Sequence, residues 1–164
     1  MSYYHLSFET ALTREPKPVS IIRVDPTGLE APRRALEVLR AGGLVVFPTE
    51  DGYLVGCSAA DPAAITRLRE ASGAGAGSLT TLVARRESAG GTTPAARVPR
   101  HLVALALVQG AGSLTATPGV PSGRPAPNAQ RVVFHLGDKV DLVLDAGPIH
   151  RQPAAPAAAA GGGR

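Results

Sequence analysis

The sequence predicts an α/β fold in which a twisted mixed sheet is flanked by helices. A segment with an apolar helical face ends at Gly42-Gly43 and leads directly into the continuous apolar run 44–47. Such a run is typical of a strand with both faces covered. Segments of helix and strand character then alternate along the chain, as they do in α/β proteins. The length of 164 residues fits one domain of this class.

The first forty residues predict one strand and one helix. Residues 19–24 are rich in β-branched side chains and are expected to form a short strand that ends at the turn 25–28. Pro32 lies near the first turn of the following helix, where a missing backbone N–H costs little. We therefore expect residues 1–28 to be an N-terminal extension with an edge strand, followed by the main domain over residues 29–150.

The middle of the chain predicts a turn, a helix and a strand. Residues 48–53 are expected to turn the chain after the apolar strand. Asp61 and Pro62 then supply the N-cap and the first-turn proline of a second helix. That helix fades into the glycine run 72–78, and residues 79–84 predict a strand.

A loop, a buried helix and a strand are expected next. Residues 85–96 show no periodicity and predict a loop. Residues 101–110 are apolar and predict a buried helix that is capped by Gly110. Residues 113–117 predict a short strand after that helix.

The closing part of the chain predicts one more helix and strand. After a turn-rich stretch, Asn128 supplies the N-cap of a helix that Gly137 closes. Residues 141–144 predict the last strand. Residues 151–164 are dominated by Pro, Ala and Gly and predict a disordered tail.

Composition limits the class of protein that this chain can be. Aromatic residues make up only 4% of the chain, so Val, Leu and Ala must build the core. The single cysteine, Cys57, excludes an intramolecular disulfide and a multi-thiolate metal site. No apolar run approaches the roughly 20 residues of a membrane span, and the N-terminus lacks the pattern of a signal peptide. We therefore expect a cytoplasmic protein with no membrane partner and no bound metal.

The charge favours an anionic ligand without choosing its class. The net charge is +4, but the basic residues are scattered apart from two arginine pairs. Nucleic-acid binders usually gather such charge into a stripe. A solvated surface is the simpler explanation of the pairs, and a nucleotide would suit the same excess.

Three segments are candidate ligand sites, and two of them carry polar side chains at the ends of expected strands, where ligands bind in an open α/β sheet. Residues 48–57 bring a threonine hydroxyl, two carboxylates and a tyrosine, although an ordinary polar loop with a packed tyrosine would look the same. The glycines of residues 73–77 could form an anion-binding nest. Because they follow a helix and no P-loop lysine accompanies them, a linker explains them better. Residues 115–123 cluster three hydroxyls, which bind oxyanions or simply cap their own turn.

In this order the segments resemble the YrdC-like family. Residues 39–50, followed by Tyr53, resemble the family's opening, where a proline-threonine turn and a tyrosine line the active cleft. Residues 97–101 resemble its arginine-valine-proline strand end, 115–123 its serine/threonine-serine-alanine-asparagine motif, and 137–147 its closing strand. The resemblance covers roughly residues 30–148, and the stretch 69–84 is most similar to the YciO-type branch.

The resemblance implies a twisted sheet around a basic concave cleft. Synthase members of the family join L-threonine, bicarbonate and ATP into threonylcarbamoyl-adenylate and release pyrophosphate, for a modification of transfer RNA. Family members are also described as binding double-stranded RNA. We therefore expect no tightly bound cofactor, with ATP and its Mg²⁺ as substrate. The resemblance leaves the catalytic residues unassigned. It implies substrate binding by six residues: Thr49, Tyr53, Arg97, Thr115, Thr117 and Ser122.

Within those six, the resemblance implies different roles. Thr49 and Tyr53 would orient a threonine-like ligand, and Arg97 would pair with a carboxylate or phosphate. The hydroxyls of Thr115, Thr117 and Ser122 would contact phosphate or carbamate oxygens.

The departures from the family pattern predict a truncated, catalytically impaired domain. The lysine-x-arginine pair that follows the second helix of the synthases is absent from residues 71–75. Only a short loop separates Ala84 from Arg97, where the family has a further helix and strand. The strands 44–47 and 79–84 are therefore expected to be under-covered, and a homodimer would supply the missing layer.

Two other interpretations remain open. One is an active threonylcarbamoyl-AMP synthase, a nucleotidyltransferase whose missing cations come from Arg85 or Arg86. The other is a non-catalytic module that binds double-stranded RNA or tRNA, or a gene fragment.

Overall fold

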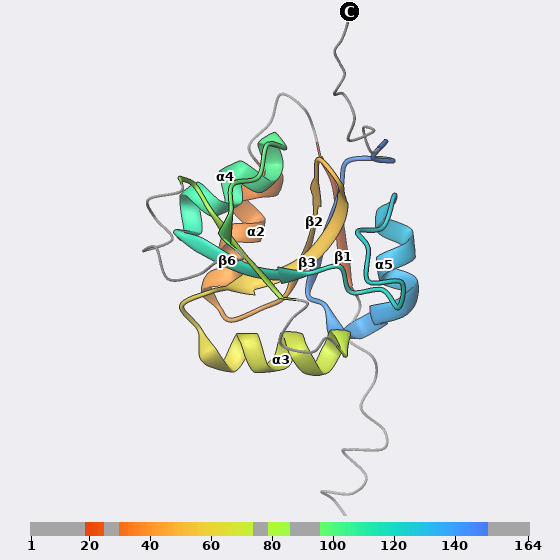
Figure 1. Cartoon of the computed structure of the whole chain (residues 1–164), viewed down its shortest axis with the longest axis horizontal. Coiled ribbons are helices and arrows are strands. Elements are labelled where there is room, and N and C mark those ends of the chain that lie inside the picture. The colour runs from red at the N-terminus through yellow and green to blue at the C-terminus, as the bar shows by residue number, and fades with distance from the viewer. Residues whose placement is uncertain (1–18, 25–29, 74–78, 86–95, 151–164) are drawn as a thin grey trace, which may run out of the picture.

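The chain folds around one seven-stranded mixed sheet with helices on both faces (Figure 1). The computed structural model describes residues 19–24, 30–73, 79–85 and 96–150. The strands follow the order β1-β7-β2-β3-β6-β4-β5 across the sheet. The predicted fold class, a twisted mixed sheet flanked by helices, is confirmed. The strands are β1 (Ser20–Arg23), β2 (Val45–Thr49), β3 (Gly52–Ser58), β4 (Thr80–Val83), β5 (Ala96–Arg97), β6 (Ser113–Thr117) and β7 (Leu142–Asp145).

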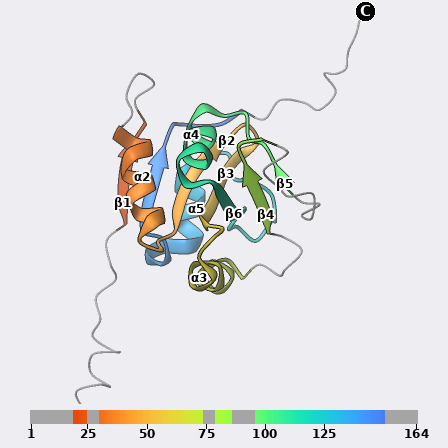
Figure 2. The same cartoon turned by 90° about the vertical axis from the view of Figure 1, so that its left-hand side faces the viewer.

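The sheet joins a parallel part to an antiparallel part. β7 lies between β1 and β2 and is parallel to both. β3 is antiparallel to β2 and to β6. β4 is antiparallel to β6 and parallel to β5, which is the far edge. Figure 2 shows β1 at one edge of the sheet and β5 near the other.

Two apolar cores lie on opposite faces of this sheet. The helices are α2 (Glu30–Arg40), α3 (Pro62–Ser72), α4 (Leu102–Ala111) and α5 (Ala129–Leu136), followed by the 3-10 helix η3 (Gly137–Lys139). α2 and α4 pack with Val45 and Phe47 of β2 on one face. α3 and α5 pack with Leu44 and Val46 on the other. The sheet is therefore the middle layer of three.

The expected defect in coverage is wrong for the described core. All four residues of the segment 44–47 are fully buried, because the two helix layers cover β2 from both sides. In the segment 79–84, Leu82 and Val83 are also buried, while residues 79–81 are half-buried. Residues 86–95, most of the expected loop, lie outside the described residues. The expected tail 151–164 does as well.

β3 was not expected from the sequence, which predicted a turn over residues 48–53. Only residues 50–51 form the turn, and the strands on both sides run up to it. Pro48 is tolerated in β2 because the pairing with β7 is restricted to Val45 and Val46, so no β7 carbonyl needs a donor at that position.

The prediction that Gly110 caps α4 is wrong. The helix continues to Ala111, and Gly112 ends it with a positive φ of 94°. A Cβ at Gly110 would collide with the side chain of Leu36, so this glycine allows α2 and α4 to approach closely. The caps of the other two helices are confirmed, because Asp61 and Asn128 accept from backbone N–H groups of their first turns.

The expected edge strand belongs to the same sheet as the rest of the described chain. Residues 20–23 pair along their length with β7. No helix of the described residues is long and apolar enough to cross a bilayer.

Candidate functional site

Thr49 lies at the end of β2 and is fully buried. Its hydroxyl donates to the carbonyl of Gly52 at 2.6 Å and accepts from the N–H of Asp51 at 3.2 Å. Both bonds are local to the β2–β3 turn. The hydroxyl that the resemblance assigns to a ligand therefore closes the hairpin in this structure.

Arg97 pairs with the carboxylates of the same turn. Its Nη2 lies 3.1 Å from Asp51 Oδ2 and 3.4 Å from Glu50 Oε2. These side chains are between 30% and 37% exposed, so water still reaches the group. The cation at the end of β5 is therefore partly neutralised by the chain itself.

Glu50 also fixes the segment that leads into α4. Its Oε1 accepts from the backbone N–H groups of Arg100 at 3.0 Å and of His101 at 3.3 Å. Burial alone would raise the pKa of Glu50, but these N–H groups and the charge of Arg97 outweigh it and hold the pKa below its ordinary value. The side chain is an anchor between the hairpin and the helix.

His101 supplies the N-cap of α4. Its Nδ1 accepts from the N–H of Val103 at 3.2 Å. Burial lowers the pKa of His101, although the nearby charge of Glu50 opposes that shift. A neutral ring fits this role, because Nδ1 must keep its lone pair to accept the bond.

Tyr53 is fully buried at the start of β3, and its hydroxyl holds the segment after β7. It donates to the carbonyl of Gly147 at 2.7 Å and accepts from the N–H of Ala146 at 2.8 Å. Burial is the main cause that raises the pKa of Tyr53, with the nearby Asp145 adding to it. The protonated phenol thus links the start of β3 to the end of β7 by two hydrogen bonds.

Asp145 holds the same segment after β7 in place. This residue is not among the sites predicted from the sequence. Its Oδ1 accepts from the N–H of Gly147 at 2.9 Å, and its Oδ2 accepts from Nε2 of Gln130 on α5 at 3.1 Å. The Asp-Ala-Gly run after a strand is the signal that could have found it, because Asp commonly accepts from the N–H two residues on.

Thr115 and Thr117 lie on β6, and both are buried. In register, Thr115 stands between Cys57 and Thr81, and Thr117 stands opposite Val55. By strand alternation both face the same side as Val55 and Cys57, the side that α3 and α5 cover.

Ser122 lies away from that strand, in the exposed turn before α5. Its Oγ accepts from the N–H of Arg124 at 3.3 Å. This bond is the self-capping that the sequence left open as an alternative to ligand binding.

Five of the six predicted residues form two groups, and Ser122 lies apart from both in its exposed turn. Thr49 and Arg97 both contact the β2–β3 turn, Thr49 through the backbone of the turn and Arg97 through its carboxylates, on the side of α2 and α4. Tyr53, Thr115 and Thr117 lie on the side of α3 and α5. Because the sheet separates the groups, one small ligand could touch both only around the end of the sheet.

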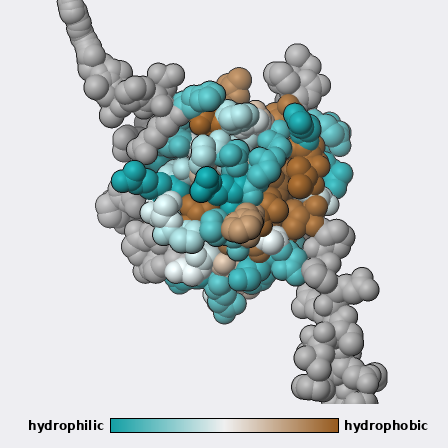
Figure 3. All heavy atoms as spheres, turned by 90° about the vertical axis from the view of Figure 1, so that its right-hand side faces the viewer, coloured by the Kyte–Doolittle hydropathy of each residue, from teal (hydrophilic) through white to brown (hydrophobic). Residues whose placement is uncertain are grey.

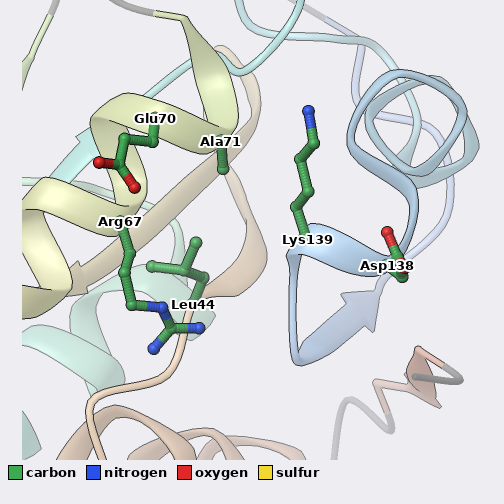
Figure 4. Close-up of a pocket in the computed structure, with 6 residues that line it drawn as sticks. All are labelled: Leu44, Arg67, Glu70, Ala71, Asp138 and Lys139. Carbon is green, nitrogen blue, oxygen red and sulfur yellow. The ribbon is translucent and has the colours of Figure 1, made fainter. Parts of the chain in front are cut away.

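A cavity of about 320 Å³ lies elsewhere, and none of the six predicted residues lines it (Figure 4). Arg67 donates there to the carbonyl of Gly42 at 2.6 Å and contacts Asp141 at 3.3 Å. Figure 4 shows Lys139 extending into the gap between α3 and η3. The lining residues are Leu44, Arg67, Glu70, Ala71, Asp138 and Lys139.

Among the described residues, the thiol and the possible metal ligands form no reactive or metal-binding group. Cys57 is buried, and burial raises its pKa to about 11, so the thiol stays protonated at neutral pH. Within the described ranges, no group of three or more His, Cys, Asp or Glu side chains is placed to hold a metal ion.

Comparison with known proteins gives a family match over most of the chain. Residues 37–88 and 75–155 match the Sua5, YciO and YrdC family, which is described as telomere recombination. A Mycobacterium tuberculosis protein with the name "Putative threonylcarbamoyl-AMP synthase" is 29% identical, over 72% of this chain and 73% of its own.

Solved structures share the fold at lower identity. P. abyssi Sua5 in complex with L-threonine is 24% identical with a TM-score of 0.65, over 80% of this chain and 51% of its own. E. coli YciO is 20% identical with a TM-score of 0.64, over 84% of this chain and 87% of its own. The chain thus spans about half the length of the Sua5 structures that it matches.

Proposed function

The chain belongs to the Sua5/YciO/YrdC family, and on that basis we propose that it is a catalytically impaired relative of threonylcarbamoyl-AMP synthase that still binds L-threonine or ATP. The observation that carries this proposal is the pairing of Arg97 with Asp51 and Glu50. The one cation among the six predicted residues is already partly neutralised by these carboxylates.

Impaired catalysis follows from the charge that the reaction develops. Attack on ATP builds negative charge on its phosphates, which the synthases meet with a lysine-x-arginine pair after the second helix. In this chain α3 ends instead in Ala71, Ser72 and Gly73. Loss of a single preorganised donor costs about 10²- to 10³-fold in rate, so we expect very weak pyrophosphate release.

Binding survives because the ion pairs at Arg97 are weak. They are about one-third exposed, and pairs of this kind contribute about 1 kcal/mol or less. A carboxylate or phosphate can therefore displace them at a cost of about fivefold in affinity. L-threonine is the ligand of the P. abyssi Sua5 complex. ATP with Mg²⁺ and bicarbonate would be the other substrates.

Pyrophosphate release tests the loss of catalysis. The chain is incubated with ATP, Mg²⁺, L-threonine and bicarbonate, and released pyrophosphate is measured against a blank without protein. We expect a rate close to the blank. A turnover of about 1 s⁻¹, the low end for ordinary enzymes, would instead identify an active synthase.

Calorimetric titration with ATP and with L-threonine tests the retained site. Asp51→Asn should strengthen binding, because it frees Arg97 from one carboxylate. Arg97→Met should abolish it, and Arg33→Met, an exposed change on α2, is the matched control. If Arg97→Met and Arg33→Met bind alike, Arg97 is not part of the site.

Double-stranded RNA or tRNA is the second candidate ligand: the net charge of +4 suits a polyanion, although the basic residues are not gathered into a stripe. Binding of this kind would weaken steeply as the salt concentration rises, because counterions are released from the phosphates. A duplex RNA that binds tightly at low salt while ATP and L-threonine do not would favour the RNA-binding module over the impaired synthase.

A further inference from the structure

β1 forms one edge of the sheet, and half of the backbone N–H and C=O groups of β1 point away from the sheet. The N–H of Val24 donates to the carbonyl of Asp145 on β7 at 2.9 Å. Because backbone groups of successive strand residues point to opposite sides, those of Ser20 and Ile22 also point toward β7. Those of Ile21 and Arg23 point outward, and no described strand pairs with them.

The outward edge also carries an exposed apolar side chain. Ile21 is 56% exposed. It stands opposite Val143, so it faces the side of α3 and α5. Figure 3 views the molecule from the side of α5 and β1, and hydrophobic residues gather there on its right-hand part. Soluble proteins usually protect such an edge, since unpaired strand groups and an apolar side chain favour association.

We propose that β1 pairs with β1 of a second copy of this chain, antiparallel, about a two-fold axis at Ile21. In this register Ile21 lies opposite its own copy, and Val19 lies opposite Arg23. Both pairings use residues whose backbone groups point outward, so each is a hydrogen-bonded pair. A shift of one residue would place residues whose backbone groups point toward β7 opposite residues of the second copy, and these hydrogen bonds would be lost.

The side chains favour the same register. It places the two Ile21 side chains against each other on the uncovered part of that face, which removes them from water. Each Arg23 meets Val19 rather than the other Arg23, so no like charges are opposed. A second copy is therefore a complementary occupant of this edge.

The size of the seam sets the expected strength. Stable interfaces bury about 1,200–2,000 Å², and one short strand pair with a single isoleucine contact buries less. We therefore expect a weak dimer whose fraction rises with protein concentration.

A cysteine scan along β1 tests the register. In a hydrogen-bonded antiparallel pair the Cα atoms are about 5.5 Å apart, which suits a disulfide. Ile21→Cys should therefore give a covalent dimer on mild oxidation. Arg23→Cys is the matched control, because the axis separates its two copies by four residues, about 13 Å along the strand. Cys57 is buried and does not compete.

Sedimentation of the full chain tests the association without a crosslink. Ile21→Pro removes an outward N–H and leaves the bonds to β7 intact, so it should abolish the dimer while circular dichroism stays unchanged. Leu102→Lys, at an 80% exposed residue of α4, should leave the dimer unchanged. Equal crosslinking of the two cysteine variants, or a monomer mass at every concentration, would overturn the proposal.

Discussion

Removal of the Tyr53 hydroxyl tests whether this residue has a structural role or a ligand-binding role. The hydroxyl makes two partly buried hydrogen bonds to the segment after β7, so Tyr53→Phe should leave a carbonyl and an N–H without these partners. We expect a loss of about 2 kcal/mol in the free energy of unfolding, measured in urea. Thr66→Val removes an exposed helix hydroxyl and should change little. A variant that keeps its stability but loses L-threonine binding would restore the role that the resemblance implies.

Glu50 should make stability depend on acid pH. Its pKa in the folded chain lies below its ordinary value, so the ionised form contributes stability at higher pH. That contribution is lost as the pH falls through the folded pKa. As the pH falls from 6 to about 3, the Glu50→Gln variant should therefore lose less stability than the native chain. Chemical unfolding at each pH measures this difference in the free energy of unfolding. Glu37→Gln, at an exposed position of α2, should follow the native profile.

At the scale of elements, two glycines at helix and hairpin boundaries should respond differently to alanine. Gly73 ends α3 with a φ of 68°, and a Cβ there meets no atom within 4 Å. Gly73→Ala should cost about 1 kcal/mol, from backbone conformation alone. At Gly52, where φ is 134°, a Cβ would lie 2.6 Å from the carbonyl of Ala126. Gly52→Ala should cost about 3 kcal/mol or more, measured by thermal unfolding, and an equal loss for both would contradict the close approach.

The sequence predicted elements whose signals are local. The helix of residues 30–40, the capped start of α3 and the apolar strand β2 follow from periodicity, capping residues and an apolar run. β3 could not be predicted in this way, because Pro48 and Gly52 read as turn residues. Pro48 fits within a strand because β7 stops pairing before it, and Gly52 is required there because Ala126 lies close. Both conditions depend on residues far away in the sequence.

The candidate site shows the same limit more sharply. Residue types and order identified Thr49, Tyr53 and Arg97, but not their partners within the chain. The carbonyl of Gly147 lies 94 residues from Tyr53, and Glu50 lies 47 residues from Arg97. Whether a hydroxyl or a cation is free for a ligand depends on such contacts, which no local pattern encodes.

At the scale of the molecule, the two cores should unfold together. Val45 and Val46 are neighbours on β2, both fully buried, and they point into opposite cores. Val45→Ala and Val46→Ala should each cost about 2 kcal/mol and shift one common transition. Calorimetry with near- and far-ultraviolet circular dichroism checks this, and two separate transitions in either variant would show that the faces are independent.

The position of β7 has a consequence for how the chain can be built on the ribosome. β1 meets the rest of the sheet only through β7, the last strand of the described chain. At the usual elongation rate of about 5–20 residues per second, β1 emerges on the order of ten seconds before the strand that pairs with it. During that time its apolar residues have no native neighbour in the sheet. Of the described strands, β1 therefore waits longest during synthesis for the strand that pairs with it.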